Sequence, residues 1–207
     1  IIQPVRRRDD CCIHAVASRR RAAAKEYARL HGITKAYAGY DELLADPDIT
    51  IVYNALPPAA HAEWSIKALK AGKHVLCEKP LAMTAAEAEV MVEAAEGAGR
   101  VLAEAFHDRY HPVFLHLLAH KRSGALGEIH ALRAEFHVDI PFDPHNIRHD
   151  PAQGGGAMMD LGCYPLHWLR SFMGEEPEIL SAQAKLTPLN VDQRMEVKMR
   201  FGGGVDA

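Results

Sequence analysis

The first half of the chain alternates short apolar runs with helical patterns, and this alternation limits the possible folds more than any other feature. We expect strands at residues 12–17, 49–54, 74–77 and 101–105, and helices at residues 20–31, 41–45, 60–71 and 84–97. Thr84 and Glu87 form a capping box at the start of the last helix. Strands that alternate with helices build βαβ units, so the sequence predicts a parallel sheet covered by helices.

The pattern changes near residues 106–112, where we expect a second domain to begin. This part of the chain predicts helices at residues 113–122 and 160–173, and strands at residues 128–138, 179–186 and 195–201. Residues 128–138 alternate in polarity, which is typical of a mixed or antiparallel sheet. The second half therefore has the pattern of an α+β domain.

Composition excludes several classes of protein. The 207 residues carry a net charge of −3, and the basic runs at residues 6–8 and 19–21 are short and lack interleaved aromatic residues, so we expect no nucleic-acid partner. No apolar run approaches the length that spans a bilayer, so we expect no membrane partner. The four cysteines show no CxxC spacing, which favours a reduced, cytoplasmic setting over a disulfide framework.

A charged pair and a proline follow the strand predicted at residues 74–77. Ligands of open α/β sheets bind beyond the carboxyl ends of the strands, so Glu78 and Lys79 are candidate site residues. Pro80 has a fixed φ and permits a cis bond, which holds the preceding lysine in one orientation. A solvated loop lysine is the alternative, and the tripeptide alone does not decide between them.

A glycine-rich loop at residues 153–157 leads into the helix predicted at residues 160–173. Asp160, Tyr164 and His167 lie at positions i, i+4 and i+7, so they share one face of this helix. The alternative is structural, because a carboxylate is favoured near a helix N-terminus and a tyrosine packs well in a core. That alternative leaves three polar groups on one face without a role.

Five motifs, in this order and spacing, resemble the Gfo/Idh/MocA oxidoreductases, and within them the branch of dimeric dihydrodiol dehydrogenase and glucose–fructose oxidoreductase. They lie at residues 16–19, 54–61, 71–81, 104–112 and 154–164. The resemblance implies a Rossmann-type parallel sheet over residues 1–108 and an α+β substrate and dimerisation domain, with a mostly antiparallel sheet, over residues 109–207. It also implies hydride transfer between NADP and a CH–OH group of a sugar, polyol or dihydrodiol.

NADP is the expected cofactor, with NAD as the alternative. An acidic residue at the end of the second strand of a nucleotide-binding fold binds the ribose of NAD, whereas arginine accommodates the extra phosphate of NADP. This chain has Ser18, Arg19 and Arg20 at that position, and a solvated basic helix start is the alternative for them. The resemblance further implies that the cofactor contacts Leu56, Pro57, His61, Glu78, Lys79 and Arg109.

Oxidation of an alcohol needs a group that accepts the hydroxyl proton. The resemblance makes Tyr164 the leading candidate, with Lys79 lowering the pKa of its phenol and Asp160 orienting the pair. Tyrosine four residues after the aspartate favours the dihydrodiol or sugar branch over the inositol dehydrogenases. Phe106 and His167 are expected substrate contacts, and a packed histidine is the alternative for His167.

Two parts of the family pattern are missing from this sequence. No Gly-x-Gly-x-x-Gly turn precedes the strand at residues 12–17, and members of the family continue past the position of Ala207. We therefore expect an internal fragment that lacks the first βα unit and the end of the second domain. The alternative functions are an NAD-dependent glycoside hydrolase, a non-catalytic cofactor-binding regulator and an inactive fragment.

The remaining expectations concern metals and partners. Four histidines recur at residues 107, 111, 116 and 120, but zinc sites usually add cysteine or carboxylate ligands and Pro112 interrupts the helical path. We expect a solvated helical face there and no metal. The resemblance implies a homodimer through the sheet of the second domain, where the strand predicted at residues 128–138 has apolar residues on both faces.

Overall fold

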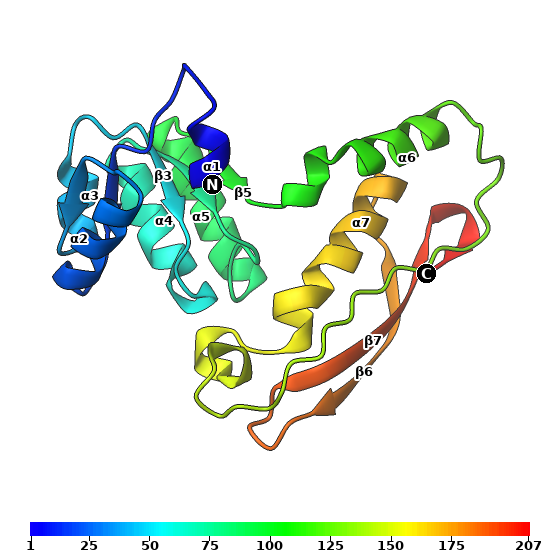
Figure 1. Cartoon of the computed structure of the whole chain (residues 1–207). Coiled ribbons are helices and arrows are strands. Elements are labelled where there is room, and N and C mark those ends of the chain that lie inside the picture. The colour runs from blue at the N-terminus through cyan, green and yellow to red at the C-terminus, as the bar shows by residue number, and fades with distance from the viewer. The chain divides into compact units, whose positions relative to one another are not determined.

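The computed structural model describes all 207 residues and divides into two compact units, each of which is described by itself (Figure 1). The first unit comprises Ile1–Ala55, His61–Cys77 and Thr84–Ala103, and the second comprises Leu56–Ala60, Glu78–Met83 and Glu104–Ala207. Two short segments that follow strands of the first unit therefore belong to the second. The domain boundary between residues 108 and 109 stays a prediction.

The first unit alternates strands and helices, as the sequence predicts. Its elements are α1 (Ile2–Val5), β1 (Ala15–Ala17), α2 (Arg21–Leu30), β2 (Lys35–Tyr37), α3 (Tyr40–Ala45), β3 (Ile51–Asn54), α4 (His61–Lys70), β4 (His74–Cys77), α5 (Ala85–Ala98) and β5 (Leu102–Glu104). β1 pairs in parallel with β2, and β3 pairs in parallel with β4 in a second sheet of order β3-β4-β5. The expected Rossmann-type parallel arrangement is confirmed.

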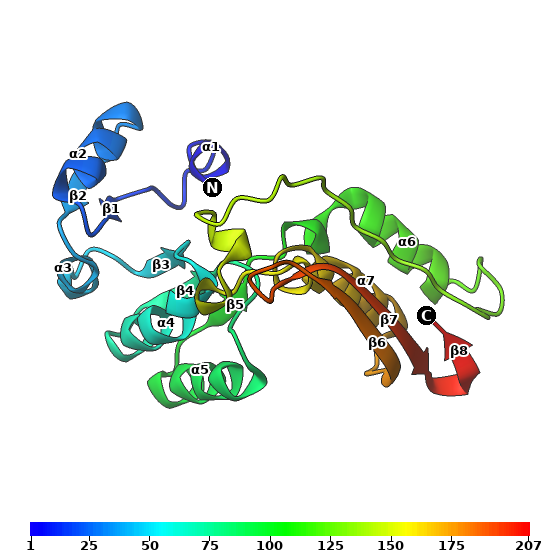
Figure 2. The same cartoon turned by 90° about the horizontal axis from the view of Figure 1, so that it is seen from below.

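The core of the first unit lies where α4 and α5 pack side by side beneath β4 (Figure 2). Leu69 of α4, Val75 of β4 and Met91 of α5 are each at most 2% exposed. The expected cap of α5 is present, because the Thr84 side chain accepts a hydrogen bond from the Glu87 amide at 3.2 Å. These contacts anchor β4 in the core of the first unit.

The second unit is α+β, as the sequence predicts. Its elements are a 3₁₀ turn (His107–Tyr110), α6 (Pro112–Arg122), two further 3₁₀ turns (Ile147–His149 and Pro151–Gln153), a π-helical turn (Met158–Gly162), α7 (Cys163–Met173), β6 (Glu178–Leu186), β7 (Asp192–Phe201), a 3₁₀ turn (Gly202–Gly204) and β8 (Val205–Asp206). β7 pairs antiparallel with both β6 and β8.

One face of this antiparallel sheet is covered by α7 (Figures 1 and 2). Leu169 of α7 packs with Met199, Phe201 and Val205 in a buried cluster. All nine residues of β6, by contrast, are exposed. None of the helices in the structure is both long and apolar enough to span a bilayer.

The strand expected at residues 128–138 is wrong. This segment is extended, but it makes only one isolated β-bridge, between Ala131 and Asp206, supported by a 2.9 Å hydrogen bond from the Leu132 amide to the Asp206 carbonyl. Its neighbour β8 has two residues, so it offers too little backbone for a ladder. Ile129, Leu132 and Ala134 are only partly buried against the core cluster, and apolar contact alone does not make a strand, which also needs a partner.

Candidate active site

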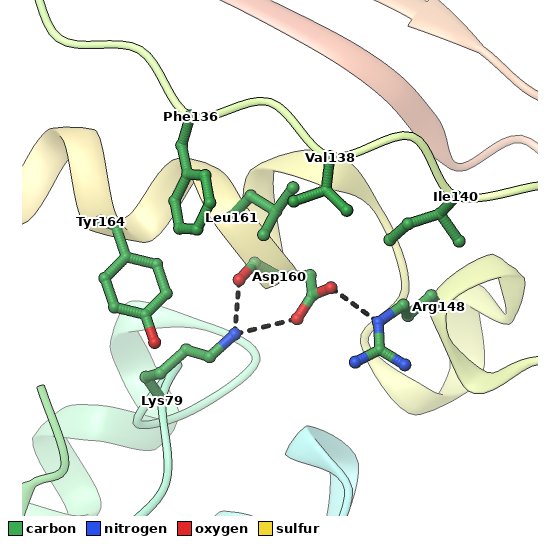
Figure 3. Close-up of a pocket in the computed structure, with 8 residues that line it drawn as sticks. All are labelled: Lys79, Phe136, Val138, Ile140, Arg148, Asp160, Leu161 and Tyr164. Carbon is green, nitrogen blue, oxygen red and sulfur yellow. Dashed lines mark hydrogen bonds and ion pairs between the residues drawn. The ribbon is translucent and has the colours of Figure 1, made fainter. Parts of the chain in front are cut away.

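A cavity of about 440 Å³ lies within the second unit, next to the start of α7 (Figure 3). Eight residues line it: Lys79, Phe136, Val138, Ile140, Arg148, Asp160, Leu161 and Tyr164. Three of them are the residues that the sequence analysis proposed as catalytic. The cavity combines an apolar side, formed by the segment at residues 136–140, with a charged side.

Lys79 reaches this cavity from the segment that follows β4. Its peptide bond to Pro80 is cis, as the proline permits. The ammonium Nζ donates a hydrogen bond to Asp160 Oδ1 at 2.9 Å and a second one to the backbone carbonyl of Asp160. The Lys79 side chain is only 16% exposed, so this charge has left most of its water and is compensated by one residue.

Asp160 lies between two cations. Opposite Lys79, Arg148 Nε donates to Asp160 Oδ2 at 2.8 Å, and Figure 3 shows the carboxylate between the two side chains. Burial by itself would raise the pKa of the Asp160 carboxyl, but the hydrogen bonds and charges of Lys79 and Arg148 outweigh it and hold the pKa below its ordinary value. Asp160 is therefore a carboxylate at neutral pH.

The glycine-rich loop brings Arg148 and Asp160 together. The amide of Gly156 donates to the Arg148 carbonyl at 2.9 Å, and the Gly156 carbonyl accepts from the Asp160 amide at 3.0 Å. Gly155 packs so closely that a Cβ there would lie 2.7 Å from the Arg148 carbonyl oxygen. The absence of side chains lets the loop fold back on the 3₁₀ turn that carries Arg148.

Asp192, the first residue of β7, completes the loop from the other side. Its Oδ2 accepts a hydrogen bond from the Met158 amide at 2.6 Å, at the start of the π-helical turn. An acidic side chain is favoured at this end of a helix because it satisfies a free backbone N–H. The glycine-rich loop, the π-helical turn and β7 thus fix the backbone position of Asp160.

Tyr164 lies in the first turn of α7 and is 7% exposed. Its hydroxyl points toward the Lys79 side chain (Figure 3), whose Nζ lies 5.2 Å from the centre of the phenol ring. Burial raises the pKa of the Tyr164 phenol to about 12, and neighbouring acidic groups add to the rise. The phenol pKa is thus shifted in the direction opposite to the one expected from Lys79, because burial dominates.

Phe106 and His167 contact each other beside this site and do not line the cavity. Their rings stack with centroids 4.2 Å apart and 4° between the planes, and Phe106 also meets the Tyr164 ring edge-on at 5.5 Å. Burial lowers the pKa of the His167 imidazole. These contacts favour the packed-histidine alternative, and a role for either residue in substrate binding stays a prediction.

The other predicted cofactor residues lie in both units. In the second unit, the Glu78 carboxylate accepts a hydrogen bond from the Lys79 amide at 3.2 Å. Leu56 and Pro57 lie in the segment after β3. Arg109 is exposed on the 3₁₀ turn His107–Tyr110. In the first unit, His61 begins α4 and is 1% exposed, so its side chain is part of the core. Contact between these residues and a cofactor stays a prediction.

Ser18, Arg19 and Arg20 lie between β1 and α2. The Ser18 hydroxyl oxygen accepts a hydrogen bond from the Arg20 amide at 3.2 Å, Arg20 is the N-cap residue of α2, and both arginines are exposed. The first turn of α2 contains no acidic residue. Two exposed guanidinium groups at the N-terminus of a ten-residue helix fit a phosphate group, because charge, donors and helix dipole act together.

Arg148 was missed in the sequence because it lies in a loop without periodicity, twelve residues before Asp160. Asn146 gives the one local signal, since its side chain caps the 3₁₀ turn through a 3.0 Å bond from the Arg148 amide. A cap of this kind marks where a turn begins, but not what the next side chain touches. The ion pair with Asp160 depends on the fold of the loop.

Comparisons with known proteins give one consistent result. The family described as "Oxidoreductase family, NAD-binding Rossmann fold" matches residues 1–106, and "GFO/IDH/MocA C-terminal domain" matches residues 114–207. A trans-1,2-dihydrobenzene-1,2-diol dehydrogenase of Xenopus tropicalis is 37% identical over 91% of this chain and 57% of its own length. A D-xylose 1-dehydrogenase (NADP(+)) of Haloferax volcanii is 36% identical over 93% of this chain and 59% of its own length.

Among solved structures, the chain is similar to KijD10, a 3-ketoreductase of Actinomadura kijaniata in complex with NADP and TDP-benzene. The two are 33% identical with a TM-score of 0.90, and the match covers 100% of this chain and 63% of that one. The chain thus spans 57–59% of the length of these two curated relatives.

Proposed function

The chain belongs to the Gfo/Idh/MocA family of oxidoreductases, and from that premise we propose that the protein transfers a hydride between NADP and a CH–OH group of a sugar, polyol or dihydrodiol. One observation carries the proposal: Lys79 lines the same cavity as Asp160 and Tyr164, although it lies 81 residues before Asp160 in the sequence. An oxidoreductase that acts on alcohols needs a group that exchanges the hydroxyl proton, and the Tyr164 phenol has that chemistry.

Each residue of this group has a distinct part in the proposal. The nicotinamide, when bound, supplies the acceptor for the hydride. Tyr164 takes up the proton of the substrate hydroxyl, and Lys79 holds that hydroxyl oxygen by a charged hydrogen bond. Asp160 positions the Lys79 ammonium through the 2.9 Å contact, and Arg148 holds Asp160 from its other side. Phe136, Val138 and Ile140 form the apolar side of the cavity.

We assign the preference for NADP to Ser18, Arg19 and Arg20. Two similar proteins support the assignment, because the Haloferax enzyme is named for NADP(+) and the Actinomadura structure is a complex with NADP. The exposed Arg19 and Arg20 side chains and the absence of an acidic residue from the first turn of α2 support it independently. Cationic side chains here would attract the phosphate that distinguishes NADP from NAD, and no carboxylate in the first turn of α2 would repel it.

Fluorescence titration with NADP and NAD tests the cofactor preference. Arg19→Ala should weaken NADP binding roughly ten- to a hundredfold, as expected for losing a charge-assisted contact of about 1.5–3 kcal/mol, and leave NAD binding nearly unchanged. Arg7→Ala, at an exposed arginine of the same unit, is the matched control. Equal binding of NAD and NADP by the wild-type protein would refute the assignment.

Two of the alternatives, the glycoside hydrolase and the non-catalytic regulator, predict different results. A glycoside hydrolase of this family would release nitrophenol from a nitrophenyl glycoside without net reduction of cofactor. A regulator without catalysis would bind NADP and oxidise no alcohol. Lys79 and Tyr164 together favour the oxidoreductase, because a protein that only binds cofactor needs no group to exchange a substrate proton.

A further inference from the structure

The proposed function, on which this inference rests, requires a path by which the proton of Tyr164 reaches water. Tyr164 has to gain and lose a proton in every turnover, yet its side chain is 7% exposed and its phenol pKa lies at about 12. A buried phenol with so high a pKa does not ionise at neutral pH. It accepts a proton from a substrate only if its own proton leaves in the same step.

The charged groups beside the phenol are already engaged. Lys79 Nζ donates both to the carboxylate and to the backbone carbonyl of Asp160. The two carboxylate oxygens of Asp160 in turn accept from Lys79 and from Arg148. This network orients the lysine, and none of these hydrogen bonds leads from the phenol to water.

His107 is placed differently. Its Nδ1 lies 3.4 Å from the Tyr164 hydroxyl oxygen, and the two rings meet edge to face with centroids 5.5 Å apart. The imidazole is on the 3₁₀ turn His107–Tyr110 and is exposed, so water reaches it directly. One ring nitrogen therefore faces a buried phenol while the residue as a whole is in contact with solvent.

His167, the other imidazole near Tyr164, does not connect the phenol to solvent. His167 stacks against Phe106, its Nδ1 lies 3.4 Å from the Ser171 hydroxyl, and its Nε2 is buried without a hydrogen bond. Burial also lowers the pKa of His167, which disfavours its protonated form. Of the two imidazoles near Tyr164, the exposed one is the one that touches its hydroxyl.

We propose that His107 relays the proton between the Tyr164 phenol and water. During oxidation the substrate O–H bond breaks and its proton passes to Tyr164 Oη, while the phenol proton passes to His107 Nδ1. The hydrogen on the hydroxyl-bearing carbon leaves with both bonding electrons, as a hydride that the oxidised nicotinamide of NADP would accept, and the carbonyl forms. The imidazolium then releases one proton to water, and exchange with water restores the tautomer with Nδ1 free.

The first test uses the cofactor-free protein and does not depend on activity. Ring-nitrogen NMR of the histidines, with His107 assigned from the spectrum of His107→Gln, reports whether Nδ1 accepts a hydrogen bond. Tyr164→Phe removes the phenol donor, so the His107 Nδ1 resonance should move. The resonances of His130, which is exposed and makes no contact with Tyr164, should stay. An Nδ1 resonance that does not respond to Tyr164→Phe would overturn the relay.

The second test measures turnover with NADP. His107→Gln keeps a polar side chain but cannot become a cation, and it should lower kcat by about tenfold to a hundredfold. Free imidazole should restore part of the lost rate in His107→Gln, which a merely structural defect would not permit. His130→Gln is the matched control and should keep the wild-type kcat. Full activity of His107→Gln, or a loss that imidazole does not relieve, would contradict the relay.

The two tests separate this inference from the proposed function. If the wild-type protein reduces no NADP with any sugar, polyol or dihydrodiol, the proposed function is wrong. The NMR comparison still decides whether the His107 imidazole and the Tyr164 phenol share a proton. If the wild-type protein is active but His107→Gln loses nothing, the relay alone is wrong.

Discussion

Replacing Asp160 by asparagine removes the negative charge from between Lys79 and Arg148 and changes the shape of the side chain very little. The Lys79 side chain is 16% exposed and the Asp160 side chain 22%, so both charges are largely out of water. The variant therefore leaves a buried ammonium without its counter-ion. The free energy of unfolding of the second unit should fall, and the two ion pairs contribute unequally.

The pair with Lys79 contributes most of the expected loss. Breaking a buried ion pair costs about 3–5 kcal/mol when one charge stays behind uncompensated. The asparagine oxygen and the backbone carbonyl of residue 160 still accept from Lys79, which reduces the loss. Arg148 is 47% exposed, so water screens its pair and the contribution is at most about 1 kcal/mol. We expect Asp160→Asn to destabilise the second unit by about 2–3 kcal/mol at neutral pH.

The effect should depend on pH in a definite direction. The pKa of Asp160 is lower in the folded protein than its ordinary value. The stabilisation that the Asp160 carboxylate provides is therefore fully present above the pKa of the carboxyl in the unfolded chain, which is about 4. The stabilisation is lost as the pH falls through the folded pKa, because the carboxylate is then protonated in both states. The difference between the wild type and Asp160→Asn should therefore shrink steadily below about pH 4.

Urea denaturation followed by the fluorescence of Trp168, which belongs to the second unit, measures this difference. Trp64 belongs to the first unit, and Trp64→Phe in both proteins removes its signal. Asp139→Asn, at an exposed carboxylate near the cavity, is the control and should change the midpoint very little. Equal stability of Asp160→Asn and wild type at pH 7, or a difference that persists in full at pH 3, would refute the reasoning.

Further predictions concern the glycine-rich loop, a helix cap and assembly. Gly156→Ala should cost about 1–3 kcal/mol of stability in urea denaturation, because φ is +122° and the new Cβ would lie 2.2 Å from Asp192 Oδ1; Gly97→Ala, with nothing within 4 Å, should cost nothing. Thr84→Ala should lower stability by about 1 kcal/mol by removing the α5 cap. We propose a homodimer through the uncovered face of the β6-β7-β8 sheet, whose strand β6 is exposed along its whole length. Sedimentation should show a dimer at micromolar concentration, and a strict monomer would contradict it.

The sequence predicted the parts of the fold that depend on local periodicity. Strands such as β4 are short apolar runs, and helices such as α5 begin at a side-chain cap, so neighbouring residues define them. β2 (Lys35–Tyr37) was not expected, because it has three residues and no apolar run. The sheet partner of a short strand is set by its neighbours in space, which periodicity does not report.

Part of the candidate site could also be predicted from the sequence, because it depends on the spacing of neighbouring residues. Lys79 follows a strand, and Asp160 and Tyr164 are one turn apart after a glycine-rich loop, so their relation could be read from spacing. Arg148 could not be found in this way, because its contact with Asp160 depends on how the loop folds back. The raised phenol pKa of Tyr164 could not be found either, since burial and neighbouring acidic groups determine it.

The central claim is that Lys79 and Tyr164 act together in NADP-linked oxidation of an alcohol, and a double-mutant cycle tests it most directly. The measurement is kcat for NADPH formation by the wild type, Lys79→Ala, Tyr164→Phe and the double variant, with NADP binding checked by fluorescence. Each single variant should lose about a hundred- to ten-thousandfold in kcat and keep most of its NADP affinity. Because both serve one proton transfer, the double variant should lose little more than either single one. Losses that multiply, or a fully active Tyr164→Phe protein, would contradict the account.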